Sequence, residues 1–96
     1  MKFVVSQCRT RILNVKKCKV FYCYECTDND INHASEIRIN RITMGKYVTN
    51  KQAMLAFDLL LHWLICPEES MFGNIKNYIM PSSEDINNIM IERNIV

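Results

Sequence analysis

The sequence has few residues that interrupt regular structure, with two glycines and two prolines among 96 residues. Flexible linkers are usually rich in glycine and serine, and tight turns favour glycine and proline. Their scarcity predicts short loops and one globular domain over residues 1–96. A chain of this length is long enough to bury one hydrophobic core and too short for two.

Long apolar runs are also missing. Arg9 and Arg11 interrupt the N-terminal segment, which therefore lacks the apolar stretch of about ten residues that a secretory signal needs. The longest apolar stretch, 54–66, contains Asp58 and His62 and is shorter than the roughly 20 residues that span a bilayer. We therefore expect an intracellular, cytoplasmic protein without a membrane partner.

The cysteines do not form the even set of a secreted disulfide framework. There are five, at positions 8, 18, 23, 26 and 66. An odd number without a secretory signal indicates a reducing compartment. The simplest interpretation is that they are small apolar side chains in strands and in one helix.

Acidic residues are absent from the first 19 positions, which hold six lysines and arginines. Residues 1–51 carry ten basic and four acidic side chains, whereas residues 52–96 carry two and six. One interpretation is a basic face that binds phosphate or an acidic protein. The alternative, which we favour, is that the two halves interleave in the fold and neutralise each other.

Three N-terminal segments have strand patterns: 2–7, 9–15 and 18–26. The third is rich in aromatic and β-branched residues and has apolar side chains on both faces, so we expect it to be central in its sheet. Thr27 and the acids after it predict a helix start, with a helix to about residue 38 or 43. The stretch 37–42 also alternates, so a strand competes there, and 46–48 is a further short strand.

The second half predicts two helices. Thr49 and Gln52 have capping-box spacing before an apolar stripe of Ala53, Phe57, Leu60, Leu61 and Leu64, and Pro67 ends the helix. Ser82 or Ser83 begins a last helix to about Arg93, with a stripe of Ile86, Ile89, Met90 and Arg93. Between them, 75–80 is a short strand or helical turn. Together these segments predict an α+β fold: a small antiparallel sheet of about three N-terminal strands with two to three helices packed on one face.

Cysteine and histidine spacing gives a candidate zinc site. Zinc is held tetrahedrally by thiolates and imidazoles, and residues four apart on a helix share a face. Against this, residues three apart in a strand point to opposite faces, so core packing is favoured and zinc remains an alternative cofactor. His33 or Cys18 is a substitute ligand. The candidate ligands are Cys23, Cys26, His62 and Cys66.

Catalytic chemistry has weaker support. The Cys23–Cys26 spacing is that of thiol oxidoreductases, but those enzymes place it at a helix N-terminus. A cysteine–histidine pair has no identifiable orienting group or oxyanion hole here. No phosphate loop, nucleophile elbow or zinc-protease motif occurs, and we therefore assign no catalytic residue.

Basic residues alternate with aromatic ones near the N-terminus. Single-stranded nucleic acid is bound by such surfaces, since bases stack on exposed rings and cations follow the phosphates. The alternative is that the rings are core and the cations protect a sheet edge. The candidate binding residues are Arg9, Arg11, Lys16, Lys17, Lys19, Tyr22 and Tyr24.

The preferred hypothesis for function is a non-enzymatic accessory or regulatory protein that modulates or inhibits a larger host machine by protein–protein contact. Ten asparagines and twelve isoleucines are typical of an AT-rich genome. Many viruses and phages have such genomes, and so do many cells, so a viral or phage origin is one interpretation. A nucleic-acid-binding protein that uses the basic stripe is the alternative, followed by a zinc-stabilised interaction module. A homodimer formed through a helix face is a further alternative.

Overall fold

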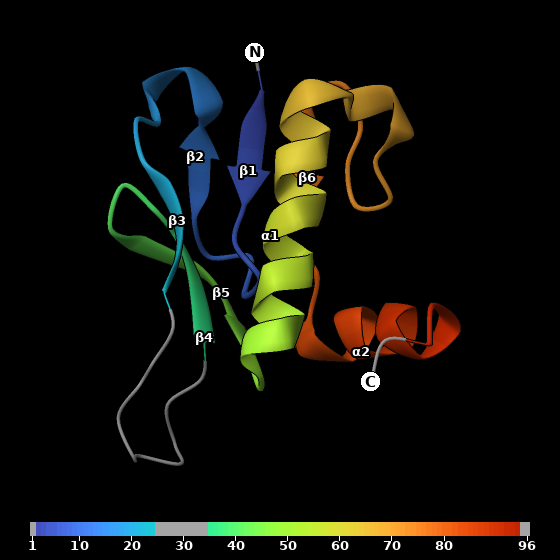
Figure 1. Cartoon of the computed structure of the whole chain (residues 1–96). Coiled ribbons are helices and arrows are strands. Elements are labelled where there is room, and N and C mark those ends of the chain that lie inside the picture. Colours follow the sequence, from blue (N-terminus) through green and yellow to red (C-terminus); the bar gives the residue numbers. More distant parts are fainter. Residues whose placement is uncertain (1, 25–34, 95–96) are drawn as a thin grey trace.

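Two three-stranded sheets and two α-helices make up residues 2–24 and 35–94, the part of the chain that the computed structural model describes (Figure 1). The mixed α+β class expected from the sequence is confirmed. The expectation of one antiparallel sheet is wrong, because the first two strands join a C-terminal strand in a sheet of their own.

The first sheet has the order β2-β1-β6. Its strands are β1 (Phe3–Val5), β2 (Ile12–Asn14) and β6 (Asn77–Ile79). β1 runs antiparallel to β2 and parallel to β6, with Val4 level with Tyr78. Both of those side chains are fully buried. The short strand expected within 75–80 is therefore confirmed, as the partner of the N-terminal strand.

The second sheet is antiparallel, with the order β3-β4-β5. Its strands are β3 (Phe21–Tyr24), β4 (Ser35–Ile39) and β5 (Ile42–Tyr47). The central strand is β4 and β3 lies at the edge, so the central position expected for 18–26 is wrong. A strand also replaces the helix expected to reach about residue 38 or 43. Its proposed start, 27–34, lies outside the described residues.

Alternating burial explains why 35–39 is a strand. Ser35, Ile37 and Ile39 are buried, while Glu36 and Arg38 between them are partly exposed. This two-residue period suits a sheet with one covered face. The turn to β5 consists of Asn40 and Arg41, with φ values of 51° and 69°, the left-handed pair that hairpin turns of two residues require.

Helix α1 (Asn50–Ile65) begins and ends as the sequence predicts. The Thr49 hydroxyl accepts a hydrogen bond from the Gln52 amide at 3.1 Å, and the chain leaves the helix before Pro67. The Gln52 side chain in turn accepts from the Val48 amide at 3.2 Å. The buried face is Gln52, Ala53, Ala56, Leu60 and Trp63.

The expected stripe of α1 is thus partly wrong. Leu61 is 36% exposed, and Ile65 at the end of the helix is 78% exposed. The core therefore does not surround the helix on all sides. It covers the inner face of the second sheet, and Trp63 reaches Tyr78 of the first sheet at a ring-centroid distance of 5.2 Å. One helix therefore closes the core over both sheets. No helix in the described ranges is long and apolar enough to cross a membrane.

Helix α2 (Ser83–Glu92) follows the short 3-10 turn η2 (Pro67–Glu69) and β6. Ser82 is the N-cap: its hydroxyl accepts from the Asp85 amide at 3.0 Å, and the Asp85 carboxylate accepts from the Ser82 amide at 3.2 Å. Ile86, Ile89 and Met90 are buried as expected, but Arg93 is exposed and does not belong to the buried stripe.

Candidate functional site

Three lysines of the expected basic stripe gather around the 3-10 turn η1 (Val15–Lys17), at the left of Figure 1. Lys16, Lys17 and Lys19 are all exposed, and we call these three residues the lysine turn. The turn forms locally because the Asn14 side chain accepts from the Lys16 amide at 3.0 Å and the Cys18 thiol donates to the Asn14 carbonyl at 3.2 Å.

Asn40 attaches the lysine turn to the second sheet. Its side-chain oxygen accepts from the amides of Lys19 and Val20 at 2.8 and 3.0 Å, and its side-chain nitrogen donates to the Lys17 carbonyl at 3.2 Å. Asn40 is not among the binding residues predicted from the sequence. The signal that could have found it is an asparagine at a two-residue turn, where the left-handed conformation favours this residue type.

The two arginines of the stripe lie apart from the lysines. Arg9 and Arg11 are in the loop between β1 and β2, at the opposite end of β2 from η1. Arg9 lines a pocket of about 390 Å³ together with Asp85 at the start of α2. The structure therefore divides the stripe into a lysine end and an arginine end, about 10 Å of strand apart.

Of the two tyrosines in the stripe, Tyr22 has a described side chain and Tyr24 does not. Tyr22 is partly exposed and is level with Arg38 on the outer face of the second sheet. Hydrogen bonds to Tyr22 and to Glu36 raise the pKa of Arg38 above its ordinary value. The side chain of Tyr24 lies outside the described part of the chain. A stacking platform of two tyrosines is accordingly a prediction that remains untested.

Among the described residues, no ion pair joins the basic half of the sequence to the acidic half. The ion pairs between described residues join Glu36 to Arg38 and Lys46, and His62 to Glu69. None of them connects residues 1–51 to residues 52–94. Among described residues, the expected neutralisation of one half by the other therefore does not occur through ion pairs. The lysine turn makes no ion pair with any described side chain.

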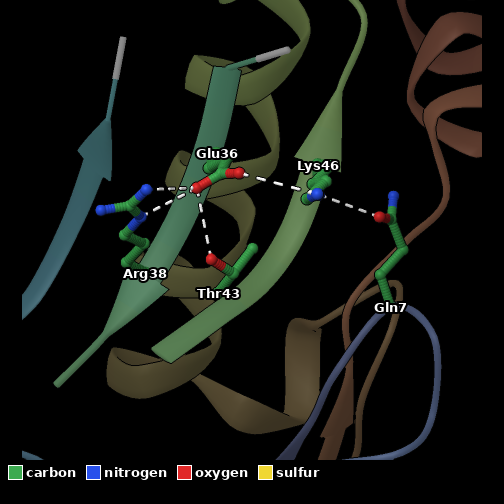
Figure 2. Close-up of polar contacts among 5 residues, drawn as sticks. All are labelled: Gln7, Glu36, Arg38, Thr43 and Lys46. Carbon is green, nitrogen blue, oxygen red and sulfur yellow. Dashed lines mark hydrogen bonds and ion pairs between the residues drawn. The ribbon is translucent and has the colours of Figure 1, made fainter. Parts of the chain in front are cut away.

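A polar network marks the place where the two sheets meet (Figure 2). The Glu36 carboxylate binds Arg38 at 2.7 Å, accepts from the Thr43 hydroxyl at 3.2 Å and lies 3.9 Å from the Lys46 ammonium. The Gln7 side-chain oxygen accepts from the Lys46 amide at 2.9 Å. The backbone amide of Gln7 also donates to the Met44 carbonyl at 2.7 Å, so the segment that follows β1 is attached to β5.

Beside this network is a pocket of about 540 Å³, which we call the junction pocket. The β1–β2 loop contributes Cys8, Thr10 and Arg11, and the β4–β5 hairpin contributes Arg41 and Lys46. Residues from two segments about thirty positions apart therefore share one wall, a proximity that periodicity alone does not predict. Of these residues, Arg11 alone belongs to the binding residues predicted from the sequence.

Cys8 is an exposed thiol in the wall of the junction pocket. Its sulfur lies 3.4 Å from the Ser6 hydroxyl and 2.8 Å from the Thr10 hydroxyl. Hydrogen bonds from Ser6 and then Thr10 lower the pKa of Cys8 to about 7, because they favour the thiolate. A substantial fraction of this sulfur is therefore ionised near neutral pH.

The candidate zinc ligands that the structure describes are not brought together. Cys23 packs against the core from β3, whereas His62 lies in the last turns of α1, 3.6 Å from Glu69, and Cys66 caps that helix. In the described ranges no group of three or more His, Cys, Asp or Glu side chains could hold a metal ion. Cys26 and the substitute ligand His33 lie outside the described residues.

Comparisons with known proteins give no family to which these features can be assigned. No protein-family model, curated protein or solved structure matches this chain.

Proposed function

We propose that the protein is a small non-enzymatic binding protein that docks its lysine turn on an acidic surface of a larger protein machine and so modulates or inhibits that machine. The observation that carries the proposal is the isolation of these charges: Lys16, Lys17 and Lys19 are exposed and make no ion pair with a described residue. Unpaired cations attract an anionic partner over several ångströms and direct its approach.

The rigidity of the turn supports the same proposal. When lysine side chains on a mobile loop bind a partner, the backbone of the loop loses conformational entropy, and that loss lowers the affinity. Here the backbone is held at Lys17, Lys19 and Val20 by one Asn40 side chain, and at Lys16 by Asn14. The partner therefore meets three charges whose backbone positions are already set.

The position of the acids of α2 is compatible with such docking. Glu84, Asp85 and Glu92 lie in α2, on the side of the molecule away from η1 (Figure 1). An acidic partner that approaches the lysine turn is thus not repelled by them at close range. At physiological salt the screening length is about 8 Å, which further limits their influence.

The test is quantitative affinity purification from nuclease-treated cell extract at about 0.15 M salt. We expect the wild-type chain to retain a protein that the Lys16→Glu/Lys17→Glu variant loses. The matched control is Lys51→Glu/Lys76→Glu, which makes the same charge change at exposed lysines outside the turn and is expected to retain it.

The retained protein is then purified and its affinity measured against salt. A moderate decrease of affinity with salt, absent in the reversed variant, is the expected result. Equal retention by both double variants would overturn the proposal. Loss of all retention after nuclease treatment would also overturn it and would favour the alternative partner, nucleic acid, whose affinity falls steeply with salt.

A further inference from the structure

The junction pocket has an excess of positive charge. Arg11, Arg41 and Lys46 line it, and Glu36 is the carboxylate among its lining residues. The Glu36 side chain is 16% exposed and pairs with Arg38 at 2.7 Å and with Lys46 at 3.9 Å, so the excess charge comes from Arg11 and Arg41. The side chains of Arg11 and Arg41 make no hydrogen bond or ion pair with a described residue.

The hairpin turn does not require an arginine at position 41. The φ of 69° there follows from the two-residue turn, and glycine adopts it with less strain than a residue with a Cβ atom. The neighbouring Asn40, at φ 51°, uses its side chain for three hydrogen bonds to the lysine turn. The Arg41 guanidinium makes no such contact with a described residue, so it is available to a ligand of the pocket.

The charges and the size of the pocket select a class of ligand. Two guanidinium groups are suited to bidentate binding of phosphate or carboxylate oxygens. A phosphomonoester carries a charge of about −1.5 to −2 and three terminal oxygens, enough for two arginines and a lysine, whereas a carboxylate has one charge. At about 540 Å³ the pocket also leaves room for the organic part of the ligand.

We propose that the junction pocket is a binding site for a phosphomonoester group, held by the guanidinium groups of Arg11 and Arg41 and by the Lys46 ammonium. This site is separate from the lysine turn, which lies at the other end of β2. The two proposals can therefore fail independently.

The first experiment titrates the full chain separately with inorganic phosphate, glucose 6-phosphate and a phosphoserine peptide. Amide NMR chemical shifts monitor each titration at about 50 mM salt. We expect the shifts to concentrate in 7–11 and 41–46. Unphosphorylated glucose and the serine peptide are the matched ligands and should cause none. Tighter binding of the peptide identifies a protein source for the phosphate, and tighter binding of the sugar phosphate a free metabolite.

Variants then assign the binding to the pocket. Arg41→Gly and Arg11→Gln should each weaken phosphate binding at least tenfold, while Lys51→Gln, which removes an equal charge at an exposed position outside the pocket and the lysine turn, should change it less than twofold. Arg41→Gly should not lower the melting temperature, because glycine suits the left-handed turn. Equal weakening by Lys51→Gln, or shifts spread over all exposed lysines, would overturn the site.

A second measurement does not depend on the variants. Alkylation of Cys8 at pH 7 should slow several-fold when phosphate is bound, because an anion beside the sulfur disfavours the thiolate and covers it. Cys18, which lies outside the pocket, serves as the internal control in the same sample. An unchanged Cys8 rate at a saturating phosphate concentration would contradict the proposed site.

Discussion

The side-chain oxygen of Asn40 lies 2.8 Å from the backbone nitrogen of Lys19, a contact between residues 21 positions apart. The same side chain binds Val20 and Lys17, so a single residue connects the β4–β5 turn to the lysine turn. Asn40 therefore has two roles: it adopts the left-handed conformation of the hairpin, and it positions the cations that we propose bind the partner.

Asn40→Gly isolates the second role, since glycine keeps the left-handed turn without strain. Loss of three hydrogen bonds should lower the free energy of unfolding by about 1–3 kcal/mol in urea denaturation. Asn40→Ala should lose about 1 kcal/mol more, because it also strains the turn. Asn87→Ala, at an exposed position of α2, should stay within about 0.5 kcal/mol of wild type. Equal stability of Asn40→Gly and wild type would show that the contact is not maintained in solution.

Two adjacent leucines of α1 should respond very differently to truncation. Leu60 is fully buried and Leu61 is 36% exposed. Leu60→Ala should lower the free energy of unfolding by about 2–5 kcal/mol, since it leaves a cavity under the helix. Leu61→Ala, with identical chemistry, should cost less than about 1 kcal/mol. Thermal or urea unfolding of the two variants side by side tests the orientation of the helix, and the reverse order would contradict it.

The two serines at the start of α2 should also differ. Ser82 caps the helix in both directions with Asp85, whereas the Ser83 hydroxyl donates to the Lys46 carbonyl at 3.3 Å. Ser82→Ala should therefore cost about 1 kcal/mol of stability. Ser83→Ala should cost less, about 0.5 kcal/mol. Chemical denaturation measures both, and a larger effect at Ser83 would place the helix start one residue later.

The Cys8 thiol should ionise at a lower pH than an ordinary cysteine thiol. Its pKa of about 7 means that alkylation by iodoacetamide should increase up to about pH 7–8 and then level off. Thr10→Val removes a hydroxyl 2.8 Å from the sulfur, so the pKa should rise and the rate at pH 7 should fall. Burial raises the pKa of Cys18, which should therefore react later in the same titration. Parallel profiles for Cys8 and Cys18, read by peptide mass spectrometry, would refute the assignment.

The helices were the most predictable part of the fold, because their signals are local. Thr49 with Gln52, and Ser82 with Asp85, each lie within four residues and make the expected caps. The strands were harder, since the pattern at 18–26 shows apolar side chains on both faces but does not show which neighbours pair with them. A strand was one of the two alternatives at 37–42, but the β4–β5 hairpin was not expected, because its turn contains Asn40 and Arg41 and no glycine.

The candidate site was predictable only in its charges. Lys16, Lys17 and Lys19 are close in sequence, so their clustering could be read directly. The junction pocket instead requires the contact of Gln7 with Met44 and Lys46, which depends on how two sheets meet. No periodicity within either segment encodes that contact, and Cys8 therefore appeared in the sequence as one small apolar residue among five.

The parallel pairing of Phe3–Val5 with Asn77–Ile79 also has a kinetic consequence. More than seventy residues separate the two strands, so a ribosome making about 5–20 residues per second needs several seconds to supply the second one. During that time β1 has β2 as its local partner and an open edge on its other side. Closure of this long loop is an entropically costly event, and we expect docking of β6 to be late in folding. Nascent chains are therefore most exposed to strand-mediated association before residue 79 emerges.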